Sequence, residues 1–317
     1  MNIVWNILTI ILALALLLFL AGFLMVYYFF VRQGEIGNRD LEKKASHQGE
    51  QYDAYFKEAV EGIEKFEQVR KEDLCIDSFD GLKLKAWLWE ADEQTDKTMI
   101  LVHGYRSYGI YEFGSRLEFL HSLGWNILLV DNRAHGRSEG RYIGFGNLDV
   151  RDVQKWTDLI IQRYGENCKI LLHGVSMGSA TVLATAGQAD CPAQIKAVVA
   201  DCGYSSGYEE VKGLFGSWLH LPKFPLLPIS YWWHKVLTGY DLKTNAAADL
   251  ISNYKGKLLI IHGGNDDFVP TFMGPEIFEA ATCQKELFIA PEAEHAMSYT
   301  VCKEEYQKRF ANLAQSI

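Results

Sequence analysis

The sequence predicts an α/β protein with a mostly parallel central sheet flanked by helices, a small helical cap insertion and an N-terminal transmembrane helix. Short apolar runs of four to six residues alternate with amphipathic helical segments between residues 98 and 289. Such runs are typical of parallel sheets that are covered on both faces. A long uncharged apolar segment at the start of the chain predicts the transmembrane helix.

Composition restricts the classes of protein to which the chain can belong. Its 317 residues are 49% hydrophobic and 22% charged, which excludes intrinsic disorder and allows a sizeable core. The net charge is −9 and no basic cluster is present, so nucleic acid is not an expected partner. The six cysteines are scattered and include no C-x-x-C pair, which indicates free thiols rather than a disulfide framework or a metal site.

The N-terminal segment, residues 3–31, has no charged side chain over its 29 residues. A helix rises about 1.5 Å per residue, so a helix of this length can cross a bilayer. No Lys or Arg precedes the segment and no good small-residue cleavage site follows it, so a cleaved signal peptide fits poorly. A buried core helix is the other alternative. We expect residues 1–31 to form a single-pass anchor in the cell membrane.

Basic residues follow this segment and suggest its orientation. Arg32, Arg39, Lys43 and Lys44 lie after it, and nothing basic precedes it except the amino terminus. The positive-inside rule then places the large C-terminal domain in the cytoplasm. Free cysteines agree with a reducing compartment.

Residues 32–72 are expected to form a juxtamembrane linker and an amphipathic helix. Residues 32–50 are polar and charged, whereas apolar residues recur at helical spacing between Tyr52 and Phe66. That apolar face can lie on the membrane or dock onto the following domain, and docking is the more ordinary outcome. A β-hairpin follows, because segments 74–76 and 82–89 flank an Asp80-Gly81 turn.

The rest of the chain, residues 73–317, is predicted to be the α/β domain. Its expected parallel strands are residues 98–103, 126–130, 169–173, 197–200, 257–262 and 286–289. Residues 204–250 contain no clear strand, but three prolines and many aromatic residues. We interpret this stretch as a helical insertion, either an ordinary covering layer or a cap over an active site. Its place just after a strand end favours the cap.

A G-x-S-x-G motif at Gly174, Ser176 and Gly178 follows one predicted strand and precedes a helix of small residues. The motif alone is common by chance, but in this strand–turn–helix context it is specific for a nucleophilic serine. Side chains at the two glycine positions would collide with the strand or with the following helix, whereas the turn exposes the serine hydroxyl. Ser176 is therefore the candidate nucleophile.

A serine hydroxyl is a weak nucleophile and needs a base that a carboxylate orients. The motif predicts the chain order serine, acid, histidine, and His295 is the only histidine beyond the strand at 257–262. We therefore assign His295 as the base. Asp266 and Asp267 both follow that strand, so that one can orient the imidazole while the other caps the next helix. Asp201, after the strand at 197–200, is a third candidate for the acid.

Two backbone N–H groups are expected to form the oxyanion hole. Tyr105 follows a His103-Gly104 turn at the end of another strand, and its N–H would join that of Met177. Two fixed donors aimed at the developing negative charge each stabilise the transition state by about 3 kcal/mol. Residues 131–138 are interpreted as a structural loop that shapes the pocket floor. Because no P-loop and no strand-linked G-x-G-x-x-G is present, no cofactor is expected.

Together these motifs resemble those of the α/β-hydrolase superfamily, over roughly residues 74–317. More narrowly, the chain is similar to bacterial membrane-anchored hydrolases grouped with serine aminopeptidases, lysophospholipases and cinnamoyl-type esterases. That group shares an H-G-x-x-D-x-x-V-P pattern, which begins here at His262 and places its aspartate at Asp266. The resemblance therefore implies a triad of Ser176, Asp266 and His295.

The leading hypothesis for function is a serine hydrolase, carboxylesterase-like or lipase-like, that cleaves a small-molecule or lipid ester. The aromatic cap and the anchor favour an apolar acyl or aryl group. A serine peptidase related to aminopeptidases is the alternative within the class; it needs a group to hold a peptide amine, and neither cap glutamate, Glu209 or Glu210, is assigned to that role. A membrane-tethered binding protein is less favoured, because inactive relatives usually lose a triad residue. The sequence indicates no oligomeric state.

Overall fold

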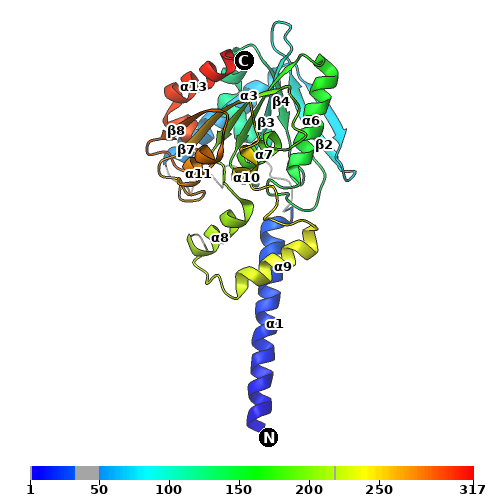
Figure 1. Cartoon of the computed structure of the whole chain (residues 1–317), viewed down its shortest axis with the longest axis vertical. Coiled ribbons are helices and arrows are strands. Elements are labelled where there is room, and N and C mark those ends of the chain that lie inside the picture. Colours follow the sequence, from blue (N-terminus) through cyan, green and yellow to red (C-terminus); the bar gives the residue numbers. More distant parts are fainter. Residues whose placement is uncertain (1, 33–49, 218) are drawn as a thin grey trace.

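The centre of the fold is an eight-stranded sheet, shown in Figure 1 as a computed structural model that describes residues 2–32, 50–217 and 219–317. The strand order is β1-β2-β4-β3-β5-β6-β7-β8. The β1–β2 and β2–β4 pairs are antiparallel and the other pairs are parallel. The expected mostly parallel sheet is confirmed, and each predicted strand coincides with an observed one to within a few residues. The strands are β1 (Glu72–Asp77), β2 (Lys83–Trp89), β3 (Lys97–Val102), β4 (Asn126–Val130), β5 (Lys169–Val175), β6 (Ile195–Asp201), β7 (Lys257–Gly263) and β8 (Gln284–Ala290).

Helices cover both faces of the sheet, because alternate side chains of the central strands point to opposite sides. In β3, Ile100 and Val102 belong to one core, whereas Met99 and Leu101 belong to the other. The first core is covered by α6 (Asp149–Tyr164), α7 (Met177–Ala186), α10 (Ala247–Ile251) and α11 (Met273–Ala280). The second is covered by α3 (Glu50–Gln68), α4 (Gly109–Phe113), α5 (Leu117–Ser122), α12 (Ser298–Val301) and α13 (Lys303–Gln315).

Helix α1 (Asn2–Phe30) extends away from the sheet, with the N-terminus at its far end (Figure 1). In the part of the chain that the structure describes, it is the one helix long and apolar enough to cross a membrane. Residues 3–17 are exposed, whereas Gly22, Val26 and Phe30 are buried. The helix therefore has an outer part that exposes its apolar side chains and an inner part that packs on the rest of the protein.

The C-terminal end of α1 is fixed to the domain by hydrogen bonds. The last carbonyl groups of a helix lack partners within the helix. Here the carbonyl of Phe29 accepts a hydrogen bond from the Tyr105 hydroxyl at 2.7 Å, and the carbonyl of Phe30 accepts one from the Ile143 N–H at 2.9 Å. The Arg32 guanidinium donates to two further backbone carbonyls in residues 136–138. These bonds leave the inner end of α1 little freedom to move relative to the sheet.

Helix α3 docks onto the domain through its apolar face. Tyr55, Ala59, Ile63 and Phe66 are buried there. Gly62 permits a close approach to the short 3-10 helix η1 (Gly114–Arg116), because a Cβ on Gly62 would lie 1.9 Å from the carbonyl oxygen of Gly114.

The expected linker falls almost entirely outside the described residues. Residues 33–49 are not described, so Arg39, Lys43 and Lys44, on which the expected orientation depends, lie outside this part of the chain.

Between β6 and β7 the chain leaves the sheet. The described residues of 204–250 include no strand and form α8 (Gly207–Ser217), α9 (Leu226–Thr238) and most of α10. Helices α8 and α9 project beyond the sheet on the same side as α1, and α9 crosses α1 (Figure 1). The rings of Phe19 and Phe23 lie 4.7 and 5.1 Å from that of Trp233. The insertion and the inner part of α1 thus form one packed unit.

Candidate active site

The turn between β5 and α7 presents Ser176 in a strained conformation. Ser176 has φ 54° and ψ −117°, a combination that non-glycine residues rarely adopt and that is typical of functional turns. Both flanking glycines are needed for this turn. A Cβ on Gly174 would lie 2.2 Å from the carbonyl oxygen of Gly178, and a Cβ on Gly178 would lie 1.9 Å from that of Val102. The steric reason inferred from the motif therefore agrees with the structure.

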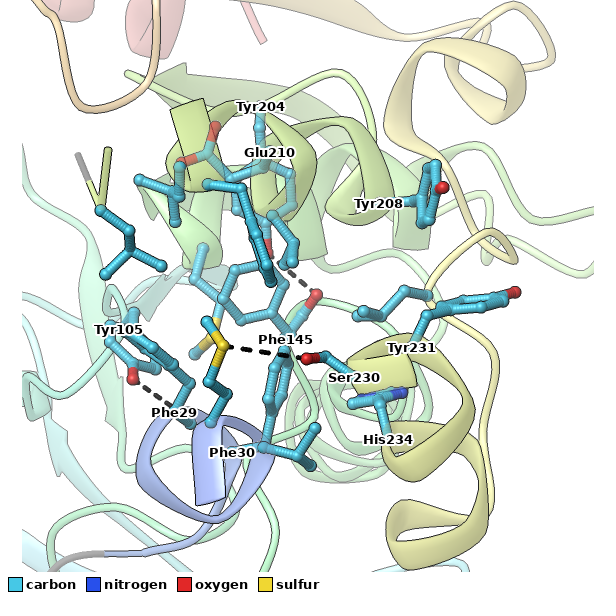
Figure 2. A pocket seen from close by; sticks show the side chains of 18 of the residues that line it. Phe29, Phe30, Tyr105, Phe145, Tyr204, Tyr208, Glu210, Ser230, Tyr231 and His234 are labelled. Carbon is cyan, nitrogen blue, oxygen red and sulfur yellow. Dashed lines mark hydrogen bonds between the residues drawn. The ribbon is translucent and has the colours of Figure 1, made fainter. Parts of the chain in front are cut away.

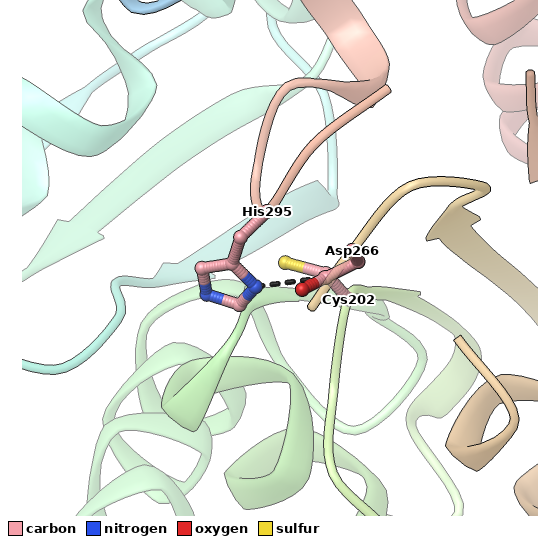
Figure 3. Close-up of side chains that lie close together, drawn as sticks. All are labelled: Cys202, Asp266 and His295. Carbon is pink, nitrogen blue, oxygen red and sulfur yellow. Dashed lines mark hydrogen bonds and ion pairs between the residues drawn. The ribbon is translucent and has the colours of Figure 1, made fainter. Parts of the chain in front are cut away.

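Three residues from the ends of three parallel strands form a hydrogen-bonded chain. The Nε2 atom of His295 lies 2.9 Å from the Ser176 hydroxyl, and its Nδ1 atom lies 2.8 Å from Oδ2 of Asp266. Ser176 follows β5, Asp266 follows β7, and His295 follows β8. Figure 3 shows the imidazole of His295 directed at the Asp266 carboxylate. The structure thus brings together the nucleophile, base and acid that the sequence proposes.

The structure separates the three candidates for the acid. Asp266 is buried, and its other oxygen, Oδ1, accepts hydrogen bonds from the N–H groups of Phe268 and Val269. Asp267 is exposed. The expectation that the second aspartate caps a helix starting near residue 270 is wrong, because Asp266 itself holds the turn and α11 begins only at Met273.

Asp201 serves a different purpose. Its carboxylate lies 3.2 Å from the guanidinium of Arg116 and accepts a hydrogen bond from the Tyr306 hydroxyl at 3.1 Å. Both charged side chains are fully buried. This pair connects β6 to η1 and α13, so Asp201 does not orient His295.

The electrostatic surroundings of His295 favour its protonated form. Burial alone opposes that form, but the neighbouring Cys202 and Asp266 outweigh it and raise the pKa of His295 well above its usual value. Burial raises the pKa of the Cys202 thiol to about 11, so this thiol is neutral near pH 7. The carboxylate of Asp266 is therefore the charge that stabilises an imidazolium at His295.

Cys202, Asp266 and His295 are also the described residues whose grouping could hold a metal ion, since their donor atoms lie within 4.8 Å of one another (Figure 3). All three side chains already have hydrogen-bond partners, Cys202 through its contact with His295. His295 contacts Ser176 and Asp266, and Asp266 holds the backbone of its own turn. The hydrogen bonds that join Ser176, His295 and Asp266 therefore account for how these side chains lie.

The turn that contains Tyr105 lies beside Ser176. A Cβ on Gly104 would lie 3.3 Å from the Cβ of Ser176, so the two turns are in close contact. Met177 is the first residue of α7, and the first N–H groups of a helix have no acceptor within it. The backbone N–H groups of Tyr105 and Met177 therefore belong to the two turns that meet at Ser176.

The loop at residues 131–138 supports this turn from behind. Its His135 accepts a hydrogen bond from the Arg106 N–H at 3.0 Å, and the Asn132 N–H donates to the His103 ring at 3.0 Å. Burial lowers the pKa of His135 to about 3, so its ring stays neutral and can accept. The loop does not form the pocket floor, because none of its residues lines the cavity described next.

A cavity of about 310 Å³ opens beside Ser176 (Figure 2). Its walls are mainly aromatic and aliphatic, and they come from α8, α9, the turn at Tyr105, the loop at Phe145 and α1. Residues of the insertion and Ser176 therefore line the same cavity. The contribution of α1 comes from its last turns, through Met25, Val26, Tyr28, Phe29 and Phe30.

Comparison with known proteins agrees with this arrangement. Residues 93–224 match the family model described as serine aminopeptidase, S33. The chain is 32% identical over 249 residues to the uncharacterized protein YqkD of Bacillus subtilis (strain 168), covering 78% of this chain and 80% of that protein. The fold is similar to that of the Pyrococcus furiosus esterase Pf2001, with a TM-score of 0.64 at 24% identity, covering 80% of this chain and 93% of the esterase. The chain belongs to the α/β-hydrolase superfamily.

Both esterases and peptidases occur among the α/β-hydrolases that share this fold. The acylaminoacyl peptidase of Pyrococcus horikoshii has a TM-score of 0.53 at 17% identity, covering 77% of this chain and 43% of the peptidase. The match to the S33 family model supports hydrolase activity, whereas the shared fold leaves the choice of bond to the chemistry of the site.

Glu210 is an unusual residue for such an apolar cavity. It lines the cavity from α8 and is only 2% exposed. Neither of its carboxylate oxygens has a hydrogen-bond partner among the described residues. Burial raises the pKa of Glu210 to about 8, so the carboxyl group is largely protonated at neutral pH.

Sequence reasoning missed two contributions to this α/β-hydrolase site. The thiol of Cys202 lies beside the Asp266–His295 pair, but no motif includes it. The inner turns of α1 line the cavity, but the uniform hydrophobicity of residues 3–31 gave no sign of a boundary. In the sequence, Glu210 is only one of two neighbouring glutamates, although helical spacing indicates that it and Glu209 point in different directions.

Proposed function

We propose that the protein is a serine esterase that cleaves carboxylic esters of apolar acids, with Ser176, His295 and Asp266 as its catalytic triad. The observation that carries the proposal is the hydrogen-bonded chain of these residues at a strained strand–helix turn. The apolar cavity beside Ser176 supports an apolar acyl or aryl group. The proposed catalytic domain comprises residues 73–317, with residues 204–250 as its cap.

In this mechanism the Ser176 hydroxyl attacks the ester carbonyl while Nε2 of His295 takes its proton. The tetrahedral intermediate then collapses to an acyl-enzyme, and the imidazolium gives the proton to the leaving alcohol. A water molecule, deprotonated by His295, attacks the acyl-enzyme and releases the acid and free Ser176. Asp266 keeps the imidazole oriented throughout and stabilises its positive charge.

The N–H groups of Tyr105 and Met177 are the proposed donors to the oxyanion. Both groups are held by rigid backbone, one by the loop at residues 131–138 and the other by α7. Donors that need no rearrangement during the reaction are the most effective ones.

The test of the triad is hydrolysis of p-nitrophenyl esters from acetate to palmitate by the full chain in detergent, compared with its Ser176→Ala variant. We expect a loss of at least about 10³-fold in kcat for the variant. Labelling of Ser176 by a fluorophosphonate provides a second readout. A folded protein without activity on any ester and without labelling would instead favour a binding role.

We also propose that α1 is a retained single-pass anchor and that the domain is cytoplasmic. Val26 and Phe30 of α1 are buried in the main core, which supports retention, because cleavage of a signal sequence would remove them. Exposed Cys75 provides the test of orientation. We expect a membrane-impermeant maleimide to label Cys75 in inverted vesicles but not in intact cells, and the reverse result would place the domain outside.

A second candidate is a peptidase, and Glu210 is the observation that favours it. A buried carboxyl group without a partner can bind a substrate ammonium group, which would favour its ionised form. The two functions differ in their response to Glu210→Gln. A peptidase should lose most of its kcat/KM on aminoacyl substrates, whereas a plain esterase should keep its preference among acyl chains.

A further inference from the structure

The inner turns of α1 belong both to the proposed membrane anchor and to the wall of the cavity beside Ser176. The same helix that exposes apolar residues 3–17 contributes residues 25, 26 and 28–30 to the wall of the cavity beside Ser176. The exposed residues 3–20, interrupted only by half-buried Leu18, span about 27 Å at 1.5 Å per residue, close to the roughly 30 Å of a bilayer core. The cavity therefore begins where the exposed part of the helix ends.

The cap provides a second apolar surface at the same level. Trp232 and Val236 of α9 are each at least half exposed, and Phe224, just before α9, is 81% exposed. The ring of Trp232 lies 5.6 Å from that of Phe19 on α1, at the inner edge of the exposed stretch. Tryptophan is one of the residues enriched at membrane interfaces. The exposed face of α9 is thus continuous with α1, and this continuity identifies a bilayer as its partner.

The helix is also connected to the turn that carries a proposed oxyanion donor. The Tyr105 hydroxyl donates to Phe29 at 2.7 Å, and the Arg106 guanidinium donates to the carbonyl of Tyr28. The ring of Phe30 packs against Phe145, another residue of the cavity wall. Removal of α1 would therefore open the cavity and release the side chains of this turn at the same time.

We propose that the inner turns of α1 complete the active site and that the substrate is a single-chain lipid ester whose hydrocarbon chain enters the cavity directly from the bilayer. This proposal rests on the proposed esterase function. Its physical basis is that a chain already in the bilayer moves between two apolar surroundings, so no apolar surface has to cross water. The cavity of about 310 Å³ is at the small end of the usual range for ligand pockets, which favours one chain over two.

The first experiment uses the full chain in phosphatidylcholine vesicles with two probes, 4-methylumbelliferyl oleate and water-soluble p-nitrophenyl acetate. Met25 lines the cavity, whereas neighbouring Leu24 is 61% exposed and does not. We expect Met25→Trp to lower the ratio of oleate to acetate hydrolysis at least tenfold, because the larger ring fills the cavity. The matched control Leu24→Trp should leave both rates within twofold of the parent.

The possible outcomes separate the two proposals. A parent protein without activity on either ester contradicts the esterase function itself. An active parent whose oleate-to-acetate ratio is the same in Met25→Trp and in Leu24→Trp contradicts the role of α1. If Met25→Trp also loses fluorophosphonate labelling, Met25→Ala replaces it, and this variant must raise the ratio for bulkier chains or the proposal fails.

Entry from the bilayer is tested separately at the exposed face of α9. Trp232→Glu places a charge at the proposed interface, and we expect it to slow hydrolysis of the vesicle-borne oleate at least fivefold more than that of the acetate. Val301→Glu, at an exposed apolar position on α12, is the control and should not change the ratio. Equal effects of Trp232→Glu on both esters would show that the substrate reaches the cavity from water.

Discussion

At the scale of single residues, the protonation of His295 determines when the site can work. The proposed base must be neutral to accept the Ser176 proton, and Cys202 and Asp266 together raise the pKa of His295 well above 6.5 despite the opposing effect of burial. We therefore expect kcat/KM to be low in acid and to rise with pH, with a midpoint above 6.5, when measured on a soluble ester between pH 5 and 10.

Asp266→Asn is the matched variant for this pH dependence. It removes the charge that favours the imidazolium, so the midpoint should fall, and loss of the correct tautomer should lower kcat by about 10³–10⁴-fold. A midpoint that does not move in this variant would mean that Asp266 does not set the pKa of His295.

Glu210 connects the chemistry of the cavity to folding stability. Burial raises its pKa from 4.5 to about 8, so the folded state holds a proton that the unfolded state loses between these values. Stability should therefore fall as pH rises from 4.5 to 8 and then stay constant. We expect Glu210→Gln, which has no proton to lose, to be more stable than the parent at pH 9 by a few kcal/mol, measured by denaturant unfolding.

The control for this prediction is the adjacent Glu209→Gln. Glu209 is exposed and pairs with Lys212 on the surface, so its substitution should change stability little at either pH. A stability difference between Glu210→Gln and the parent that is as large at pH 4.5 as at pH 9 would contradict the role given to the buried carboxyl.

Much of the site could be located from sequence at this scale, because its geometry follows from local motifs. Ser176 lies in a turn that two glycines enforce, and the sequence predicts His295 because the chain order leaves no other histidine. Only the resemblance to the hydrolase family could distinguish Asp266 from Asp267. The side chains of adjacent residues point in different directions, and the sequence pattern does not show which of them points at His295. Cys202 could not be found, because its proximity to His295 arises from the packing of β6 beside β7.

At the scale of elements, α3 holds the loop that carries the proposed base. The Tyr52 hydroxyl donates to the carbonyl of His295 at 3.1 Å, and the Gln51 side chain accepts from the Glu294 N–H at 3.0 Å. The amphipathic pattern of this helix allows it to lie on the membrane or to dock, and docking is the more ordinary outcome. The pattern could not predict where it docks, because the bond between Gln51 and Glu294 joins positions 243 residues apart.

The docking of α3 depends on a glycine in its interior. A methyl group on Gly62 would meet the backbone of η1 at 1.9 Å, so we expect Gly62→Ala to lower the free energy of unfolding by about 1–3 kcal/mol. Gly213 in α8 has open space around it, and Gly213→Ala should instead stabilise by about 0.5–1 kcal/mol. Thermal unfolding of the two variants side by side is the measurement, and shifts of the same sign would contradict the steric argument.

At the scale of the whole molecule, the two parts of α1 have different roles. Deleting residues 3–17 removes only exposed side chains, so we expect loss of membrane association with a midpoint of thermal unfolding within a few degrees of the parent. Deleting residues 1–31 also exposes the faces of α9 and Phe145 that contact Phe23 and Phe30. This longer deletion should lower the midpoint by more than about 5 °C and cause aggregation in size-exclusion chromatography.

If the two deletion variants unfold at the same temperature, α1 only attaches the protein to the membrane and does not stabilise its fold. The sequence could predict a membrane helix of this length, but it could not divide the helix, because Val26 is as apolar as Leu12. Only the packed structure shows that Val26 is 2% exposed while Leu12 is 69% exposed.

The rigid attachment of α1 has a final consequence for kinetics. If α1 is the anchor that we propose, the hydrogen bonds at its inner end keep the mouth of the cavity at a fixed level relative to the bilayer. Enzyme and substrate then diffuse in the same plane, and the rate is set by the number of substrate molecules per unit of membrane area. Adding inert lipid at constant total substrate should therefore slow the reaction, although the concentration per volume of solution is unchanged.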